Sequence, residues 1–156
     1  MNIFEASVLS ILLYGCETWI ITPQLEQRIN SFATTNCYRQ MLNIKRVDKI
    51  KLDNIYAQVN RRPLIYTINK RQLGWLGHTL RRDKDEPTTI LALYEPAVKH
   101  GQAKRGPKKL TYTSKISKLI TASAKGEMTS KDITAMAKDR QLWRKKKDDQ
   151  DKPPKP

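Results

Sequence analysis

Asp83, Asp85 and Glu86 form a tight acidic cluster, and carboxylates of this kind could hold metal ions for phosphodiester cleavage. A two-metal nuclease needs carboxylates that converge from a rigid scaffold. These three lie on a predicted loop directly after Arg81 and Arg82, whose charges would screen them. We therefore expect no catalytic residue in this cluster.

Other residues offer weaker candidates for catalysis or metal binding. His78 has no partner at the spacing of a metal ligand, so we expect it to hydrogen-bond a polar group instead. Gly74 and Gly77 stand too close together for a phosphate-cradling loop, and they lie in a predicted apolar helix. No Ser/His/Asp order appears along the chain. The sequence thus predicts no enzyme activity, no metal and no cofactor.

Lysine and arginine offer better-supported chemistry, because they bind phosphate and position a partner without reading its sequence. The 156 residues carry a formal net charge of +15. Residues 1–60 hold 6 Lys/Arg against 5 Asp/Glu, whereas residues 61–156 hold 24 against 10. The candidate phosphate contacts all lie in this basic part: Arg61, Arg62, Lys70, Arg71, Arg81, Arg82, Lys104, Arg105, Lys108, Lys109, Arg140 and Arg144.

This charge asymmetry points to a polyanionic partner. The leading candidate for this partner is RNA, DNA or their hybrid, ahead of an acidic protein or an acidic membrane surface. For each basic cluster, the alternative is a basic surface that is merely solvated. The two cysteines, Cys16 and Cys37, sit among apolar residues, which suits a reducing compartment, nuclear or cytoplasmic. The apolar run at residues 6–14 is too short to cross a bilayer, so we expect no membrane association.

The elements that must position these cations are predicted to be helices. The central one runs from Pro63 to about Arg82, with an apolar face that includes Leu73, Leu76 and Leu80. Gly74 and Gly77 are unfavourable inside a helix by roughly 1 kcal/mol each. Either another element approaches closely there, or the helix breaks after Leu73.

Helical periodicity and capping signals outline the other elements. We expect a buried helix at 2–21 that Gly15 weakens or ends, and a helix at 23–42 that starts at Thr22-Pro23. Shorter helices follow at 52–59, 87–93 and 112–124, and a last helix opens at Thr129-x-x-Asp132 and continues past Trp143. Residues 95–110 read as a basic irregular linker, and the chain from Lys145 on is predicted to be disordered.

The predicted fold class is therefore all-α: a small helical bundle of about four to six helices, with a basic irregular linker and a disordered C-terminal tail. The expected segments are a thumb-like helical bundle at 1–94, the linker at 95–110, a C-terminal helical segment at 111–147 and the tail at 148–156. Trp19, Trp75 and Trp143 stand near aliphatic residues, most of them at helical spacing. We expect them to pack in the core rather than to stack on bases.

Five segments, in order, resemble conserved blocks of non-LTR (LINE-type) retrotransposon endonuclease–reverse transcriptase polyproteins. Residues 13–19 are similar to the family's L-Y-G-x-E-T-W segment, and residues 37–42 to the end of its next conserved helix. Residues 73–81 are similar to its R-x-L-x-W-x-G-H-x-x-R block. Residues 104–109 are similar to its basic R-G-R-P-K segment without the second arginine, and residues 139–144 to its terminal D-R-x-x-W-R.

The resemblance implies a region that follows the polymerase palm in that family, namely the helical thumb and the segment after it. This chain carries no Y-x-D-D polymerase motif and no endonuclease domain. The leading hypothesis is a non-catalytic nucleic-acid-binding remnant that grips an RNA or DNA backbone. A helical protein–protein interaction module with an acidic partner, and a fragment of a decayed element without selected function, are the alternatives.

Overall fold

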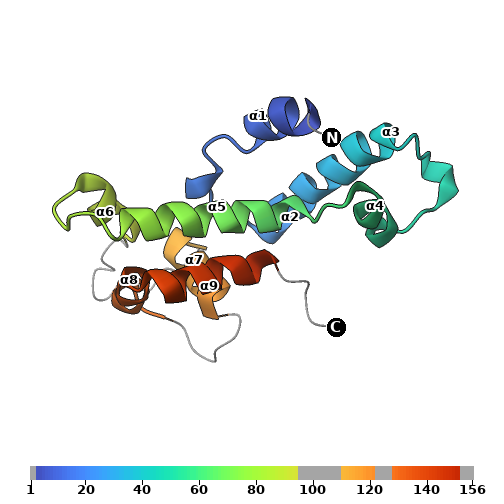
Figure 1. The fold of residues 1–156 in the computed structure, drawn as a ribbon. Coiled ribbons are helices and arrows are strands. Elements are labelled where there is room, and N and C mark those ends of the chain that lie inside the picture. The colour runs from blue at the N-terminus through green and yellow to red at the C-terminus, as the bar shows by residue number, and fades with distance from the viewer. Residues whose placement is uncertain (1–2, 95–109, 122–127, 152–156) are drawn as a thin grey trace, which may run out of the picture. The chain divides into compact units, whose positions relative to one another are not determined.

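A computed structural model describes residues 3–94, 110–121 and 128–151, and these residues form helices, turns and bends without a strand. The all-α prediction is confirmed. In the part described, no helix is both long and apolar enough to cross a membrane. The described residues carry more α-helices than the four to six predicted (Figure 1), because the predicted helix at 23–42 and the predicted last helix are each divided into more than one element.

The chain divides into two compact units. One comprises Ile21–Asn69, and the other comprises Met1–Ile20 together with Lys70–Pro156. Helix α5 (Leu64–Thr79) belongs to both, because the division falls between Asn69 and Lys70. The boundaries of these two units differ from the boundaries of the four segments expected from the sequence. The four segments stay predictions.

The unit at residues 21–69 begins with the long helix that the sequence predicted. Helix α2 (Pro23–Ser31) continues through a π-helical stretch (Phe32–Tyr38) into α3 (Arg39–Met41). The Thr22 side chain accepts a hydrogen bond from the Leu25 backbone N–H at 3.2 Å, with Pro23 in the first turn. The predicted N-terminal cap is thus confirmed.

Helix α4 (Leu52–Val59) has the predicted bounds and ends at Asn60, whose φ of 51° is left-handed. Its buried face carries Ile55 and Val59. Tyr56 meets Tyr38 edge-on, with ring centroids 6.1 Å apart, so an aromatic pair joins α4 to the π-helical stretch.

The first helix of the other unit differs from its prediction. A π-helical stretch (Phe4–Leu9) runs into α1 (Ser10–Leu12), and the chain then turns at Gly15, which has a φ of +66°. Gly15 therefore ends the helix as expected. The expectation of an all-round buried helix is wrong, because Ile11 and Tyr14 are 78% and 85% exposed. Among the described residues the segment packs through one side only, around Phe4 and Leu13.

The second half of α5 is the centre of this unit's core. Leu73, Leu76 and Leu80 pack with apolar residues of three later helices: Ile116 and Ile120 of α7 (Tyr112–Thr121), Ile133 and Ala137 of α8 (Ser130–Lys138), and Trp143 of α9 (Arg140–Asp148). Figure 1 shows α7, α8 and α9 beside the green rod of α5. Helix α5 does not break after Leu73. Helix α6 (Pro87–Ala92) follows a turn, as predicted.

The C-terminal region requires two corrections. Thr129 and Asp132 form the expected capping box, but the predicted single last helix is split at Asp139. Asp139 is extended and its side chain caps α9, accepting from the backbone N–H groups of Gln141 and Leu142 at 2.9 and 3.0 Å. The predicted disorder from Lys145 on is also wrong as far as Asp151, because α9 reaches Asp148 and a 3-10 turn covers Asp149–Asp151. Residues 95–109 of the linker predicted at 95–110, and residues 152–156, lie outside the described residues.

Candidate nucleic-acid interface

Helix α9 presents three cations in one row. Arg140, Arg144 and Lys147 are spaced by four and three residues, so they share one face and span about 10 Å of helix axis. The Asp139 cap fixes where this helix begins. On another face, Lys146 Nζ donates to the Ile120 carbonyl of α7 at 3.1 Å. The helix is therefore held in a defined rotation about its axis.

Trp143 anchors α9 onto α5. The indole is only 4% exposed, and its Nε1 donates to the Leu73 carbonyl oxygen at 2.8 Å. The prediction that Trp143 packs in the core is confirmed. Because its N–H group is used and its ring is buried, this tryptophan has no free face for a base.

The two glycines of α5 explain how α9 comes so close. A Cβ atom on Gly77 would lie under 3.0 Å from three atoms of the Trp143 ring. A Cβ atom on Gly74 would meet only Lys147 Cδ, at 4.0 Å. The predicted close approach is thus confirmed at Gly77, and Gly77 is the glycine that the packing requires.

Arg81 is half-buried and holds the end of α8. Its Nη1 donates to the Ala137 carbonyl oxygen at 2.9 Å, in the last turn of that helix. A cation at a helix C-terminus satisfies a terminal carbonyl and interacts favourably with the helix dipole. A guanidinium has five N–H donors, so this bond leaves donors for a second acceptor.

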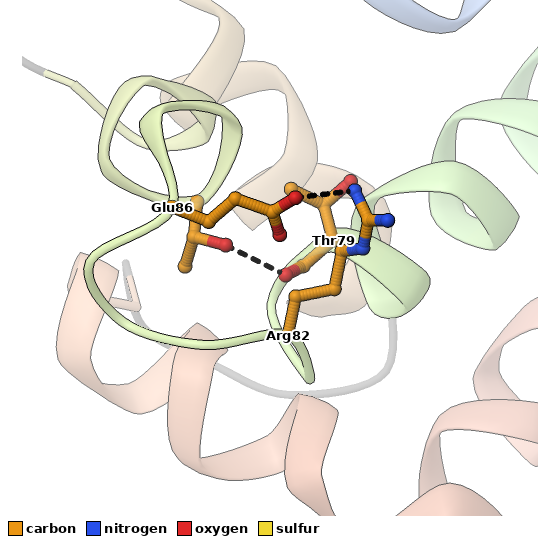
Figure 2. Close-up of polar contacts among 4 residues, drawn as sticks. Thr79, Arg82 and Glu86 are labelled. Atoms are coloured by element: carbon orange, nitrogen blue, oxygen red, sulfur yellow. Dashed lines mark hydrogen bonds and ion pairs between the residues drawn. The ribbon is translucent and has the colours of Figure 1, made fainter.

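Arg82 is oriented by the acidic loop that follows it. Its Nη1 lies 2.8 Å from Glu86 Oε1, as Figure 2 shows. The two helices on either side of this loop are joined where the Thr89 hydroxyl of α6 donates to the Thr79 carbonyl of α5 at 3.1 Å (Figure 2). Glu86 thus forms an ion pair with Arg82, while Asp83 and Asp85 are exposed. In the described chain, no group of three or more His, Cys, Asp or Glu residues is placed to hold a metal ion.

The row on α9 and the end of α5 enclose a cleft of about 580 Å³. Five of its nine lining residues are lysine or arginine, and none is acidic. The lining residues are Gly74, His78, Arg81, Arg82, Arg140, Gln141, Trp143, Arg144 and Lys147. We call this the basic cleft. Its like charges lie close together, which makes it a favourable place for an anion.

The basic cleft brings together four of the twelve cations singled out from the sequence: Arg81, Arg82, Arg140 and Arg144. Two further members, His78 and Lys147, were absent from that set. Lys147 could have been found from its helical spacing to Arg140 and Arg144. His78 lies four residues after Gly74 on α5, but nothing local marks it as part of a cation cluster.

The other predicted cations that the structure describes do not line the basic cleft. Arg71 Nη1 donates to the Leu13 carbonyl oxygen at 3.2 Å and so supports the turn after α1. Lys70 directly precedes Arg71 on α5. Arg61 and Arg62 are exposed residues of the unit at 21–69. The four linker residues, Lys104, Arg105, Lys108 and Lys109, lie outside the described residues.

The remaining predicted core residues and both cysteines are structural in character. Trp75 is half-buried and packs edge-on against Tyr112, with ring centroids 6.4 Å apart. Cys16 is buried and Cys37 is partly buried, and both are free thiols whose pKa is raised by burial. A raised pKa keeps a thiol protonated and unreactive.

Comparison with known proteins gives one clear similarity. Over 150 residues the chain is 31% identical to a putative uncharacterized transposon-derived protein of Caenorhabditis elegans. The match covers 92% of this chain and 52% of that protein, so the chain spans about half the length of the relative. No family model and no solved structure matches. The chain is thus similar, over nearly all of its length, to a protein described as derived from a transposon.

Proposed function

We propose that this chain is a transposon-derived helical protein that binds nucleic acid through the basic cleft and has no catalytic activity of its own. The observation that carries the proposal is the lining of the cleft, with five lysine and arginine residues and no carboxylate. Such a site binds phosphates and releases their counterions, which favours polyanions at moderate salt. Transposon derivation is supported by the similarity to the nematode protein.

The proposal includes a more specific origin, in the thumb and post-thumb region of a LINE-type reverse transcriptase. Support comes from the way the resembling blocks contact one another. Gly77, from the block at 73–81, packs against Trp143, from the block at 139–144. Gln72, just before the first of these, donates to the carbonyls of Cys16 and Trp19, at 3.0 and 2.8 Å, in the block at 13–19.

The absence of catalysis is part of the proposal and has its own motivation. Asp83 and Asp85 are exposed loop residues, and Glu86 is engaged with Arg82. A hydrolytic or polymerase centre needs carboxylates that converge on a metal from a rigid scaffold. The contribution assigned to this chain is therefore binding and positioning.

A charge-removal variant tests the proposal. Arg140→Gln, Arg144→Gln and Lys147→Gln together remove three positive charges from the row on α9 without touching the core. The matched control is Arg28→Gln, Arg46→Gln and Lys51→Gln, which removes two arginines and one lysine from exposed positions in the other unit. Binding to labelled oligonucleotides is measured by fluorescence anisotropy over a salt series.

We expect the cleft variant to lose about tenfold or more in affinity, while the control changes by less than about twofold. The slope of log affinity against log salt should fall by roughly 2 for the cleft variant, at about 0.7 per phosphate contact with a single strand. Equal losses in both variants would show that only the overall charge matters. Binding that polyglutamate displaces as well as a competing oligonucleotide does would instead indicate an acidic protein partner.

A further inference from the structure

The cations of the basic cleft face inward, toward the groove between two helices. Proteins that read a DNA duplex commonly insert a protruding helix into the major groove, which is about 12 Å wide. Proteins that bind single strands use a positively charged groove that follows the backbone. We propose that the basic cleft holds one nucleic-acid strand by its sugar–phosphate backbone, with the bases facing away from the protein. This inference rests on the proposed function.

The close packing of α9 on α5 supports one strand rather than two. Helix α9 lies close on α5 because Gly77 leaves room for the Trp143 ring. Packed helices have axes about 8–10 Å apart. A groove formed over such a pair is narrow compared with a whole duplex, whose two strands are separated by grooves about 6 and 12 Å wide.

The chemistry of the lining explains why the bases should face away. Two lining residues have aromatic rings: Trp143, which is 4% exposed with its N–H group bound to Leu73, and His78, which is exposed. The cleft therefore offers a single small exposed ring, the His78 imidazole, and no row of rings on which successive bases could stack. The charged lining residues are hydrogen-bond donors only, whereas base edges present both donors and acceptors. Phosphate oxygens match this donor-rich lining better than bases do.

Two of the cations, and the helix that carries the other three, are also held in place before any partner arrives. Arg81 is bound to Ala137, and Arg82 is paired with Glu86. The α9 row is fixed by the Trp143 anchor and by the bond from Lys146 to Ile120. Because these restraints are already formed, less conformational entropy is lost when a strand binds.

Three ligands of equal length, about twelve nucleotides each, distinguish the possibilities. They are a mixed-sequence single strand, a strand of the same length that lacks all bases, and a duplex. We expect the abasic strand to bind within about twofold of the normal strand. Stacking would be worth about 1–3 kcal/mol per base, so a stacking site would lose about fivefold or more for each base removed.

The duplex ligand distinguishes a cleft that holds one strand from a basic surface that attracts polyanions by charge alone. Charge density alone favours the duplex, whose salt slope per contact is about 0.9 against 0.7 for a single strand. A cleft for one strand predicts the opposite order, and we expect the duplex to bind at least about fivefold more weakly at the same salt. Both single-strand affinities should fall in the Arg140, Arg144, Lys147 variant and persist in the Arg28, Arg46, Lys51 control.

The outcomes keep the two proposals apart. Binding that depends on the cleft but prefers the duplex, or that is lost with the abasic strand, would overturn the single-strand inference and leave nucleic-acid binding intact. If no ligand binds, or if the cleft variant binds all three as well as the unmodified chain does, the proposed function itself fails.

Discussion

At the scale of single residues, Gly77 is the position on which the packing of the basic cleft depends most. The Trp143 ring fills the space that a side chain at this position would take, and its N–H group donates a hydrogen bond to the Leu73 carbonyl oxygen. Gly74, one turn earlier on the same helix, has almost free space at its Cβ position. The two glycines thus lie one turn apart on the same helix, but only Gly77 is required by the packing.

The pair gives a matched prediction for stability. Gly77→Ala should destabilise the protein by about 1–3 kcal/mol, because an extra carbon in a filled space forces the tryptophan to move. Gly74→Ala should be neutral or stabilising by up to about 1 kcal/mol, since alanine favours the helix and nothing lies closer than ordinary contact. Thermal and urea unfolding of both variants provide the measurement. Equal effects of the two substitutions would argue against the close approach of α9.

At the scale of elements, the end of α8 and the start of α9 determine which cations face the cleft. Had a single helix continued through residue 139, as the sequence suggested, the rotation of α8 about its axis would have set the directions of the side chains after that residue. The extended backbone at Asp139 resets that rotation. Trp143 can then reach α5 while Arg140, Arg144 and Lys147 form their row.

Asp139 can be tested as the residue that makes this break. Asp139→Ala should lower stability by about 0.5–2 kcal/mol, because the N–H groups of Gln141 and Leu142 lose their side-chain acceptor. Asp139→Asn keeps an acceptor and should retain most of that stability. Chemical denaturation measures both. If alanine were as stable as asparagine, the two helices would owe their separation to something other than this cap.

At the scale of the whole molecule, each of the two units contains a tyrosine that is partly buried in its neutral form. Burial, with smaller effects of Tyr38 and Asp53, raises the pKa of Tyr56 from 10.0 to about 12 in the unit at 21–69. In the other unit, burial and then the charge of Glu17 raise the pKa of Tyr112. The Tyr112 hydroxyl also donates to the Glu17 carbonyl oxygen at 3.0 Å.

These shifts predict an alkaline limit to stability. Because the folded state raises both pKa values, their contribution is fully present below about pH 10 and is lost at higher pH, for Tyr56 as the pH rises toward 12. Circular dichroism between pH 8 and 12 should show unfolding that begins above about pH 10. Tyr56→Phe should reduce the loss of stability in this range while leaving the helix content at neutral pH unchanged. An alkaline transition that is identical with and without Tyr56 would contradict the assignment for its unit.

The sequence by itself determined the fold class and most helix starts, because these depend on local signals. The Thr22-Pro23 cap, the Thr129–Asp132 capping box, the bounds 52–59 and the helix start at Pro87 all follow from a few neighbouring residues. Gly15 likewise ended its helix as expected. Residue type and spacing also identified four of the cleft's cations.

Only the tertiary structure decided which cations act together. Arg81 and Arg140 are far apart in the chain, and they line one cleft because α9 packs on the glycine face of α5. Arg71 has the same side chain as Arg81 but bonds to Leu13, away from the cleft. Contacts between residues more than fifty positions apart leave no periodic pattern in the sequence. The difference between a scattered set of basic residues and one cleft is therefore a property of the fold.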